Sequence, residues 1–374
     1  MYPFCAFACA LVLALGQRPA AAAAGGFIRE DLRIAMPAAG PRGLEALLVR
    51  PDEPGPHPLV LINHGSPREG SRRPEMTPLA LLPEAIEFAR RGWTAAIVMR
   101  RGFGDSGGGF AEDRGPCRDP DYLGAASASA ADLKAAIGFL AGRPDIDATR
   151  ILSVGVSAGG FATVALTADP PPGLVAGVSF AGGRGSGSSD AVCRDDKLID
   201  TFGALGRGSR LPMLWVYAQN DHFLGPALAQ KLRDAFTLAG GKVDFVAAPP
   251  FGSDGHRLFS TAGIPKWAPL VDDFLKAQNL VLLPSPLPPP APPDIPPPPR
   301  LSANGRKAFA EFLISAPHKA FAVSSTGAFG WRTGRRTIEA ARAAALAACA
   351  PKATDCRVMV VDDTALVIDD TAVP

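Results

Sequence analysis

The stretch "ILSVGVSAGGFATVAL" (residues 151–166) decides the fold of this chain. It joins a β-prone apolar run to a helix-like apolar run through the pentad Gly-Val-Ser-Ala-Gly, whose serine is Ser157. On a sharp strand-to-helix turn, a Cβ atom at Gly155 or Gly159 would clash with the neighbouring strand and helix. The helix that begins at the serine would point free N–H groups at a developing oxyanion. The pattern predicts Ser157 as a nucleophile; the alternative is an ordinary serine in a glycine-rich loop.

Strand-like and helix-like runs alternate on both sides of this stretch. Strands are predicted at 43–51, 57–65, 93–100, 150–157, 174–183, 212–221 and 242–250, and helices at 78–92, 127–144, 159–168, 226–241 and 267–278. This alternation is typical of a mostly parallel sheet with helices on both faces. The sequence therefore predicts an α/β fold whose reactive groups lie beyond the carboxyl ends of the strands.

Two candidate partners of Ser157 follow at later strand ends. Asp221 ends the apolar run "PMLWVYAQND", and His256 lies in the loop "PPFGSDGHRLF" after the last predicted strand. Both lie downstream of the serine, in the order serine, acid, histidine. His256 is therefore predicted to accept the serine proton, and Asp221 to orient the imidazole ring. Asp254, two residues before the histidine, remains the alternative acid.

An acyl-transfer site also needs donors for the oxyanion. One predicted donor is the backbone N–H of Ala158, the residue after the nucleophile. The other is the backbone N–H of Ser66 in the loop "NHGSP" (63–67), where Gly65 permits a tight turn. The alternative for this loop is a simple connection between a strand and a helix.

Composition divides the 374 residues into four predicted segments. Residues 1–24 form an apolar stretch and an alanine tract that suit a signal peptide cleaved before Gly25, although no Lys or Arg precedes the apolar core. A large α/β domain is predicted at 25–280, a proline-rich linker at 281–300 and a small α+β domain at 301–374. The predicted location is therefore periplasmic or extracellular, with no transmembrane helix after cleavage.

The small C-terminal domain carries no recognisable chemistry. Its sequence predicts a strand, a turn at Thr326-Gly327, a second strand, an alanine-rich helix and a final strand. Thr337 and Glu339 lie where a helix cap and an acidic first-turn residue belong. We expect a binding or accessory role, with a component of the cell envelope as its possible partner.

The net charge of +2 gives no electrostatic argument for nucleic-acid binding. Four cysteines, Cys117, Cys193, Cys349 and Cys356, remain after the predicted cleavage, an even number that favours disulfides in an exported protein. Of the three possible pairings we predict Cys349–Cys356, because these two are close in sequence, and hence Cys117–Cys193; free buried thiols are the alternative. No Cys-x-x-Cys motif or His/Cys cluster indicates a metal, and no cofactor is expected.

Over residues 27–280 the chain resembles the α/β-hydrolase superfamily, within it the dienelactone-hydrolase-like and prolyl-oligopeptidase-like group. The resemblance rests on "NHGSP" (63–67), "RRGFGDSGG" (100–108), "GVSAGG" (155–160), "YAQNDHFLGP" (217–226) and "FGSDGH" (251–256). It implies the α/β-hydrolase fold and a Ser-Asp-His hydrolase. Dienelactone hydrolases proper use a cysteine nucleophile where this chain has Ser157, so lactone chemistry is not implied.

These features predict an exported serine hydrolase that cleaves an ester, or with less support an amide, through an acyl-enzyme. Two alternatives remain open. An acyltransferase would use the same triad with an alcohol in place of water. A non-catalytic envelope-binding protein would keep the fold and use the linker and C-terminal domain for attachment.

Overall fold

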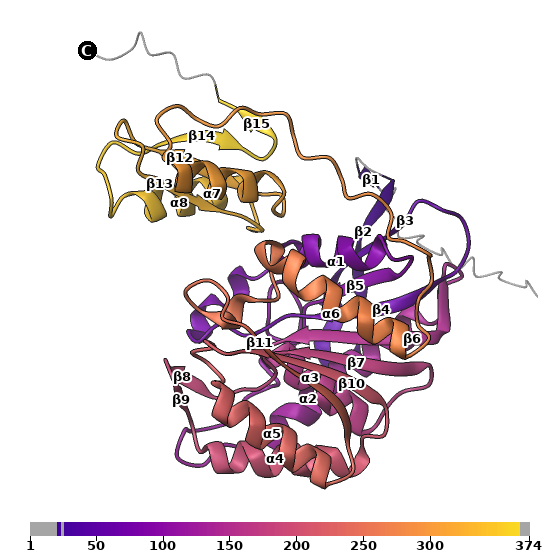
Figure 1. Cartoon of the computed structure of the whole chain (residues 1–374). Coiled ribbons are helices and arrows are strands. Elements are labelled where there is room, and N and C mark those ends of the chain that lie inside the picture. The colour runs from indigo at the N-terminus through magenta and orange to yellow at the C-terminus, as the bar shows by residue number, and fades with distance from the viewer. Residues whose placement is uncertain (1–20, 24–25, 367–374) are drawn as a thin grey trace, which may run out of the picture.

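The computed structural model describes residues 21–23 and 26–366 (Figure 1). A nine-stranded sheet forms the centre of the larger domain, in the order β1-β2-β3-β5-β4-β6-β7-β10-β11. The strands from β5 to β11 in this order run parallel, whereas β1, β2 and β3 pair antiparallel. Their bounds are β1 (Ala21–Ala23), β2 (Phe27–Ile34), β3 (Leu44–Pro51), β4 (His57–Asn63), β5 (Thr94–Val98), β6 (Ile146–Val156), β7 (Leu174–Phe180), β10 (Pro212–Ala218) and β11 (Lys242–Ala248). The predicted mostly parallel sheet is confirmed.

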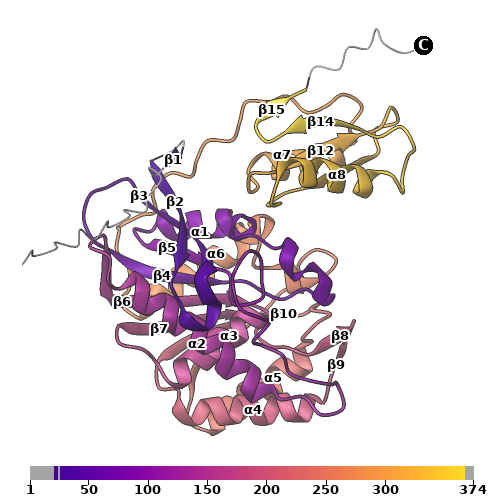
Figure 2. The ribbon, with the colours of Figure 1, turned by 180° about the vertical axis from the view of Figure 1, so that it is seen from behind.

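Helices cover both faces of this sheet. The helices α1 (Leu82–Ala89) and α6 (Ile264–Ala277) pack on one face, and the other face is covered by α2 (Tyr122–Leu140), α3 (Ala158–Ala168), α4 (Asp195–Gly208) and α5 (Pro226–Leu238) (Figures 1 and 2). Side chains alternate between the faces as strand geometry requires. On β6, Leu152 and Val154 join the core under α1 and α6, whereas Ile151 joins the core under α2 and α3.

The differences from the sequence prediction have local causes. Strand β2 was not predicted because "FIREDLRI" carries four charged residues among eight, as an exposed strand near a sheet edge can. Helix α4 was also missed. Helix α2 begins at Tyr122 rather than residue 127, because the Asp121 carboxylate caps it by accepting from the backbone N–H of Gly124 at 2.7 Å.

The predicted signal peptide lies outside the described residues except for Ala21–Ala23, which form β1. Cleavage after residue 24 would remove this edge strand and leave β2 as the edge. In the described part of the chain, no helix combines the length and the apolar character that a membrane crossing needs.

The C-terminal module is a separate sheet between two helices. Its strands β12 (Ala320–Val323), β13 (Phe329–Arg332), β14 (Arg357–Val361) and β15 (Thr364–Ala365) pair antiparallel in the order β13-β12-β14-β15. Along β12, Phe321 packs towards the aromatic side chains of α7 (Ala303–Leu313), and Ala320 and Ala322 pack towards α8 (Ile338–Cys349). The Thr337 hydroxyl caps α8, at the position predicted for the cap, whereas α7 was not predicted.

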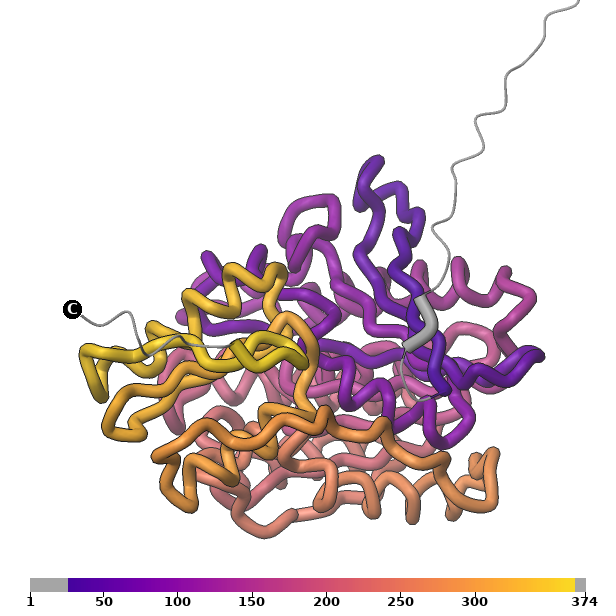
Figure 3. Tube along the Cα trace, turned by 90° about the horizontal axis from the view of Figure 1, so that it is seen from above, coloured from indigo at the N-terminus to yellow at the C-terminus, as the bar shows by residue number. Residues whose placement is uncertain are grey.

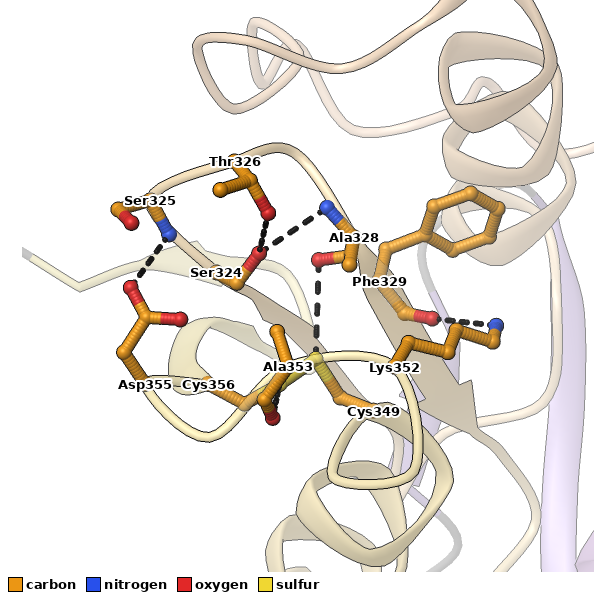
Figure 4. The surroundings of a disulfide bond; sticks show 10 residues. All are labelled: Ser324, Ser325, Thr326, Ala328, Phe329, Cys349, Lys352, Ala353, Asp355 and Cys356. Atoms are coloured by element: carbon orange, nitrogen blue, oxygen red, sulfur yellow. Dashed lines mark hydrogen bonds between the residues drawn. A yellow bond between two sulfur atoms is a disulfide. The ribbon is translucent and has the colours of Figure 1, made fainter.

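A disulfide between Cys349 and Cys356 joins the end of α8 to the start of β14 (Figure 4). The turn between β12 and β13 lies beside it. The Ser324 hydroxyl accepts from the N–H of Ala328 at 3.1 Å, and the Lys352 ammonium donates to the carbonyl of Phe329 at 2.8 Å. The disulfide thus ties the helix end to β14, and the Lys352 hydrogen bond ties the segment after the helix to β13.

The proline-rich segment 281–298 contains no helix or strand, but its first part is bound to the larger domain. The backbone N–H of Leu287 donates to the carbonyl of Arg90 at 2.7 Å, and the Arg90 side chain donates back to the carbonyl of Leu287 at 2.6 Å. The first part of the predicted linker is therefore fixed to the larger domain. Seen from above, the linker and the yellow module overlie part of the larger domain (Figure 3).

Candidate active site

The carboxyl ends of five adjacent parallel strands meet at one edge of the sheet, and the predicted site residues follow those ends. The oxyanion loop follows β4, Ser157 follows β6, Asp221 follows β10 and His256 follows β11. A cavity of about 310 Å³ opens there, and Ser66, Ser157 and Ala158 line it. The strand order, rather than proximity in sequence, brings these residues together.

Ser157 occupies a strained turn between β6 and α3. Its φ of 57° and ψ of −123° lie where non-glycine residues are uncommon, and such a conformation costs about 1–3 kcal/mol. A Cβ atom at Gly155 would lie 2.2 Å from the carbonyl oxygen of Gly159, and one at Gly159 would lie 2.1 Å from that of Asn63. Only glycine fits at either position, and the serine side chain is left partly exposed to the cavity.

Asp221 and His256 form a hydrogen-bonded pair. The imidazole Nδ1 lies 3.0 Å from Oδ2 of the fully buried Asp221 carboxylate. Oδ1 of the same carboxylate accepts from the backbone N–H groups of Phe223 and Leu224 at 2.7 and 2.9 Å. Burial alone would raise the pKa of Asp221, but the hydrogen bonds from His256 and the two N–H groups hold it below its ordinary value. Asp221 therefore stays ionised at neutral pH.

The tautomer of His256 follows from this contact. A carboxylate can only accept, so Nδ1 carries a proton, and in the neutral ring Nε2 keeps a free lone pair. The ring stacks on Phe223, with centroids 4.0 Å apart and planes 10° apart. The Arg68 guanidinium lies 3.6 Å from the centroid of the Phe223 ring. Two groups this close cannot share one ring face, so Phe223 lies between Arg68 and His256.

Asp254, the alternative acid, has a different set of contacts. Its carboxylate accepts from the backbone N–H groups of His256 and His222, at 3.0 and 3.2 Å. It thereby caps the short helix Gly255–Arg257 and shapes the loop that carries the histidine. The other nearby histidine, His222, pairs with Asp190 at the surface.

The loop after β4 is held by His64. Its Nδ1 lies 2.7 Å from the carbonyl of Gly65, and its Nε2 accepts from the backbone N–H of Arg100 at 3.1 Å. Burial is the largest effect on this ring and lowers the pKa of His64 to about 3, so the ring is neutral at physiological pH. A Cβ atom at Gly65 would lie 3.3 Å from the Cβ of Ser157, so this loop packs directly against the serine.

Within the described residues, the backbone N–H groups of Ser66 and Ala158 donate to no protein acceptor. Ala158 is the first residue of α3, where N–H groups have no partner inside the helix. Both residues line the cavity beside Ser157. Two unused donors at this position are what a developing oxyanion requires.

A buried charge cluster joins three of the loops around the cavity. The fully buried carboxylate of Glu112 accepts from the guanidinium groups of Arg100 and Arg184. Arg100 also donates to the carbonyl of His64 at 3.0 Å. Burial alone would raise the pKa of Glu112, but the two arginine charges hold it at about 2. No local sequence signal identified this cluster, because its members come from three separate loops.

A second disulfide, Cys117–Cys193, also connects loops at the cavity, with a Cα–Cα distance of 5.0 Å. One of these loops contributes residues 110 and 112–115 to the cavity wall, and the other contributes 183–186 and leads into the hairpin β8 (Ser186–Ser188) and β9 (Ala191–Val192). The predicted pairing of all four cysteines is present in the structure.

Known proteins similar to this chain include esterases and peptidases. Residues 41–198 match the family model of X-Pro dipeptidyl-peptidase (S15 family). A candidate dipeptidyl aminopeptidase IV from Bacteroides ovatus has a TM-score of 0.51 and 17% identity, covering 68% of this chain and 36% of that one. An esterase from Pyrococcus furiosus has a TM-score of 0.47 and 15% identity, covering 67% and 90%. An acylaminoacyl peptidase from Pyrococcus horikoshii has a TM-score of 0.48 and 17% identity, covering 68% and 42%. No curated protein matches the chain.

The predicted α/β-hydrolase fold is confirmed by the similarity to the Bacteroides ovatus structure, and the match of residues 41–198 to the S15 family model is consistent with the resemblance to that superfamily. The family match covers less than half of the chain. It contains Ser66 and Ser157 but ends before Asp221 and His256. The match therefore includes only part of the candidate site.

Proposed function

We propose that this member of the α/β-hydrolase superfamily is an exported serine hydrolase that cleaves a carboxylic ester through an acyl-enzyme. Ser157 is the nucleophile, His256 the general base and Asp221 the residue that orients it. The observation that carries the proposal is the strained conformation of Ser157 at the same sheet edge as the buried Asp221–His256 pair. A solvent-exposed loop serine has no reason to adopt this conformation.

The proposed reaction has two steps. The Ser157 hydroxyl attacks the ester carbonyl carbon while its proton passes to Nε2 of His256, and the resulting oxyanion accepts hydrogen bonds from the N–H groups of Ser66 and Ala158. The C–O bond to the alcohol then breaks, and the alcohol leaves with the proton from His256. In the second step, water attacks the acyl-enzyme by the same proton transfers, releasing the acid and restoring Ser157. Asp221 stabilises the imidazolium that forms in each step.

The comparisons also raise an amide substrate, because the matched family is named for a peptidase. The same triad would cleave an amide, with an amine as the leaving group. The cavity of about 310 Å³ is compatible with a small ester.

Export is supported by the two disulfides, which persist in oxidising compartments. The N-terminal sequence supports it as well, through the apolar stretch and alanine tract before residue 25. A mature chain recovered from the periplasm or medium should begin at Gly25, and an intact leader on that material would contradict the proposed cleavage.

Fluorophosphonate labelling tests the nucleophile. We expect the probe to label Ser157, and Ser157→Ala to abolish both labelling and hydrolysis of 4-nitrophenyl butyrate while the thermal unfolding curve is retained. Ser127→Ala, at an exposed serine of α2, is the matched control and should keep both. Turnover of the ester by Ser157→Ala at the wild-type rate would overturn the proposal. Hydrolysis of an Xaa-Pro-4-nitroanilide faster than of the ester would assign a peptidase.

A further inference from the structure

Arginine side chains dominate the charged lining of the cavity beside Ser157. Four arginines reach it from three separate segments: Arg68 and Arg73 after β4, Arg114 between β5 and α2, and Arg184 after β7. The two carboxylates in the lining, Glu112 and Asp113, do not balance them. Glu112 is already shared by Arg100 and Arg184. The wall therefore carries an excess of positive charge.

Three of these arginines have no carboxylate partner. Among the described residues, no carboxylate oxygen lies within 4.0 Å of the guanidinium nitrogens of Arg68, Arg73 or Arg114. Their neighbour Arg72, which does not line the cavity, contacts Glu69 and Glu75 at 3.9 and 3.8 Å. The unpaired arginines are thus a feature of the cavity wall and not of this loop as a whole.

Two of these three arginines, Arg68 and Arg73, are held in place by uncharged contacts. Arg68 stacks on Phe223 and donates to the hydroxyl of Ser186 at 2.9 Å. The guanidinium of Arg73 lies 3.6 Å from the ring centroid of Phe110. These contacts orient the guanidinium groups without neutralising them, so less side-chain freedom is lost when an anion binds.

Arg184 adds a buried donor. Its side chain is 8% exposed, and its Nε has no hydrogen-bond partner among the described residues although its other nitrogens donate to Glu112. A buried N–H without a partner costs free energy, so the hydrogen bonds of Arg184 are not all made within the described part of the chain.

We propose that this cavity is a subsite for a carboxylate, so that the preferred substrate is a small ester that also carries a free carboxylate group. This inference rests on the proposed serine hydrolase function. The planar fork of a guanidinium matches the two oxygens of a carboxylate. A substrate with a free ammonium group is repelled by the same wall, which separates this site from one that binds the amino terminus of a peptide.

Two matched substrate pairs test the proposal and show which side of the ester carries the acid. For the alcohol side, 4-acetoxybenzoate is compared with 4-acetoxybenzamide. For the acyl side, the mono-4-nitrophenyl ester of glutaric acid is compared with 4-nitrophenyl 4-carbamoylbutanoate. In at least one pair we expect kcat/KM to be about tenfold higher for the acid than for the amide at low ionic strength. The ratio should fall as sodium chloride is raised, because salt screens partly exposed charges.

Arginine variants test the cause of that preference. Arg73→Gln and Arg114→Gln should each reduce the acid-to-amide ratio about three- to tenfold. The adjacent Arg72→Gln is the matched control and should leave the ratio unchanged, because Arg72 does not line the cavity. Arg68 is not a clean test, because it stacks on the ring that contacts His256.

The two proposals fail in different ways. The carboxylate subsite alone is overturned if turnover depends on Ser157 but kcat/KM for the acid and for the amide agree within twofold in both pairs. It is also overturned if neither arginine variant reduces the preference for the acid. If the wild type hydrolyses neither pair and Ser157 is not labelled, the hydrolase proposal fails. Calorimetric binding of glutarate and glutaramide then tests the subsite. The carboxylate subsite is supported if the wild type binds glutarate more tightly than glutaramide and Arg73→Gln removes this difference. It is refuted if the wild type binds glutarate and glutaramide equally tightly.

Discussion

Replacing Glu112 by Gln should destabilise the larger domain, because it removes one charge from the buried cluster around the cavity. The Glu112 side chain is fully buried and accepts from Arg100 and Arg184. Glutamine keeps the shape but has no negative charge, and its NH₂ group cannot accept from a guanidinium. Two arginine side chains, themselves at most 8% exposed, would then be left without a counter-charge.

Two arguments give similar magnitudes for this loss. The pKa of Glu112 is held at about 2 against an ordinary 4.5, which at about 1.4 kcal/mol per pH unit corresponds to about 3 kcal/mol of unfolding free energy. Independently, removing one partner of a buried ion pair costs about 3–5 kcal/mol. For a domain of this size, about 3 kcal/mol lowers Tm by roughly 6–12 °C.

The pH dependence is the sharper signature. Because the pKa of Glu112 is lowered in the folded state, its contribution to the free energy of unfolding is complete above the ordinary pKa of 4.5. This contribution is lost as pH falls from 4.5 towards 2. The difference in Tm between wild type and Glu112→Gln should therefore be full at pH 7 and shrink on acidification below 4.5. Thermal unfolding followed by circular dichroism from pH 3 to 7 measures it.

The matched control is Asp113→Asn, an exposed neighbour whose side-chain oxygen accepts from the N–H of Gly115, a role that asparagine can keep. Its Tm should lie within about 2 °C of wild type, since exposed substitutions change stability little. A Tm for Glu112→Gln within the same interval at pH 7 would refute the reasoning that this carboxylate neutralises the two arginines.

Three further results are expected. Asp221→Asn should lower kcat by about 10⁴-fold with little change in fold, because an amide favours the wrong tautomer of His256; stopped-flow ester hydrolysis measures it, and a loss below tenfold contradicts the assigned acid. Gly159→Ala should destabilise the domain by at least about 1–3 kcal/mol in urea unfolding, because the new methyl would lie 2.1 Å from the carbonyl oxygen of Asn63; alanine at Gly138, with nothing within 4 Å, is the control and should not be destabilising. Burial raises the pKa of Glu84 to about 7, so this side chain lowers the free energy of unfolding increasingly as pH rises from 4.5 to 7. Glu84→Gln should therefore raise Tm at pH 8 but not at pH 4. An equal change in Tm at both pH values would contradict this effect of burial.

The local sequence was sufficient for much of the fold. Continuous apolar runs predicted the parallel strands, because strands buried on both faces need no polar side. The local sequence did not predict β2 and α4, because charged residues interrupt the apolar pattern there and tertiary packing stabilises both elements. The first part of the proline-rich segment is bound to the larger domain by contacts with Arg90, almost 200 residues earlier, which composition does not encode.

The sequence by itself determined where the proposed nucleophile lies and the order of its proposed partners. The glycines around Ser157 and the strand ends before Asp221 and His256 are local features, and each can be read within a dozen residues. The tertiary structure alone brought Phe223 against His256 and joined Glu112 to Arg184. The reason is that the strand order and the paths of the loops, not sequence spacing, decide which side chains meet at the sheet edge.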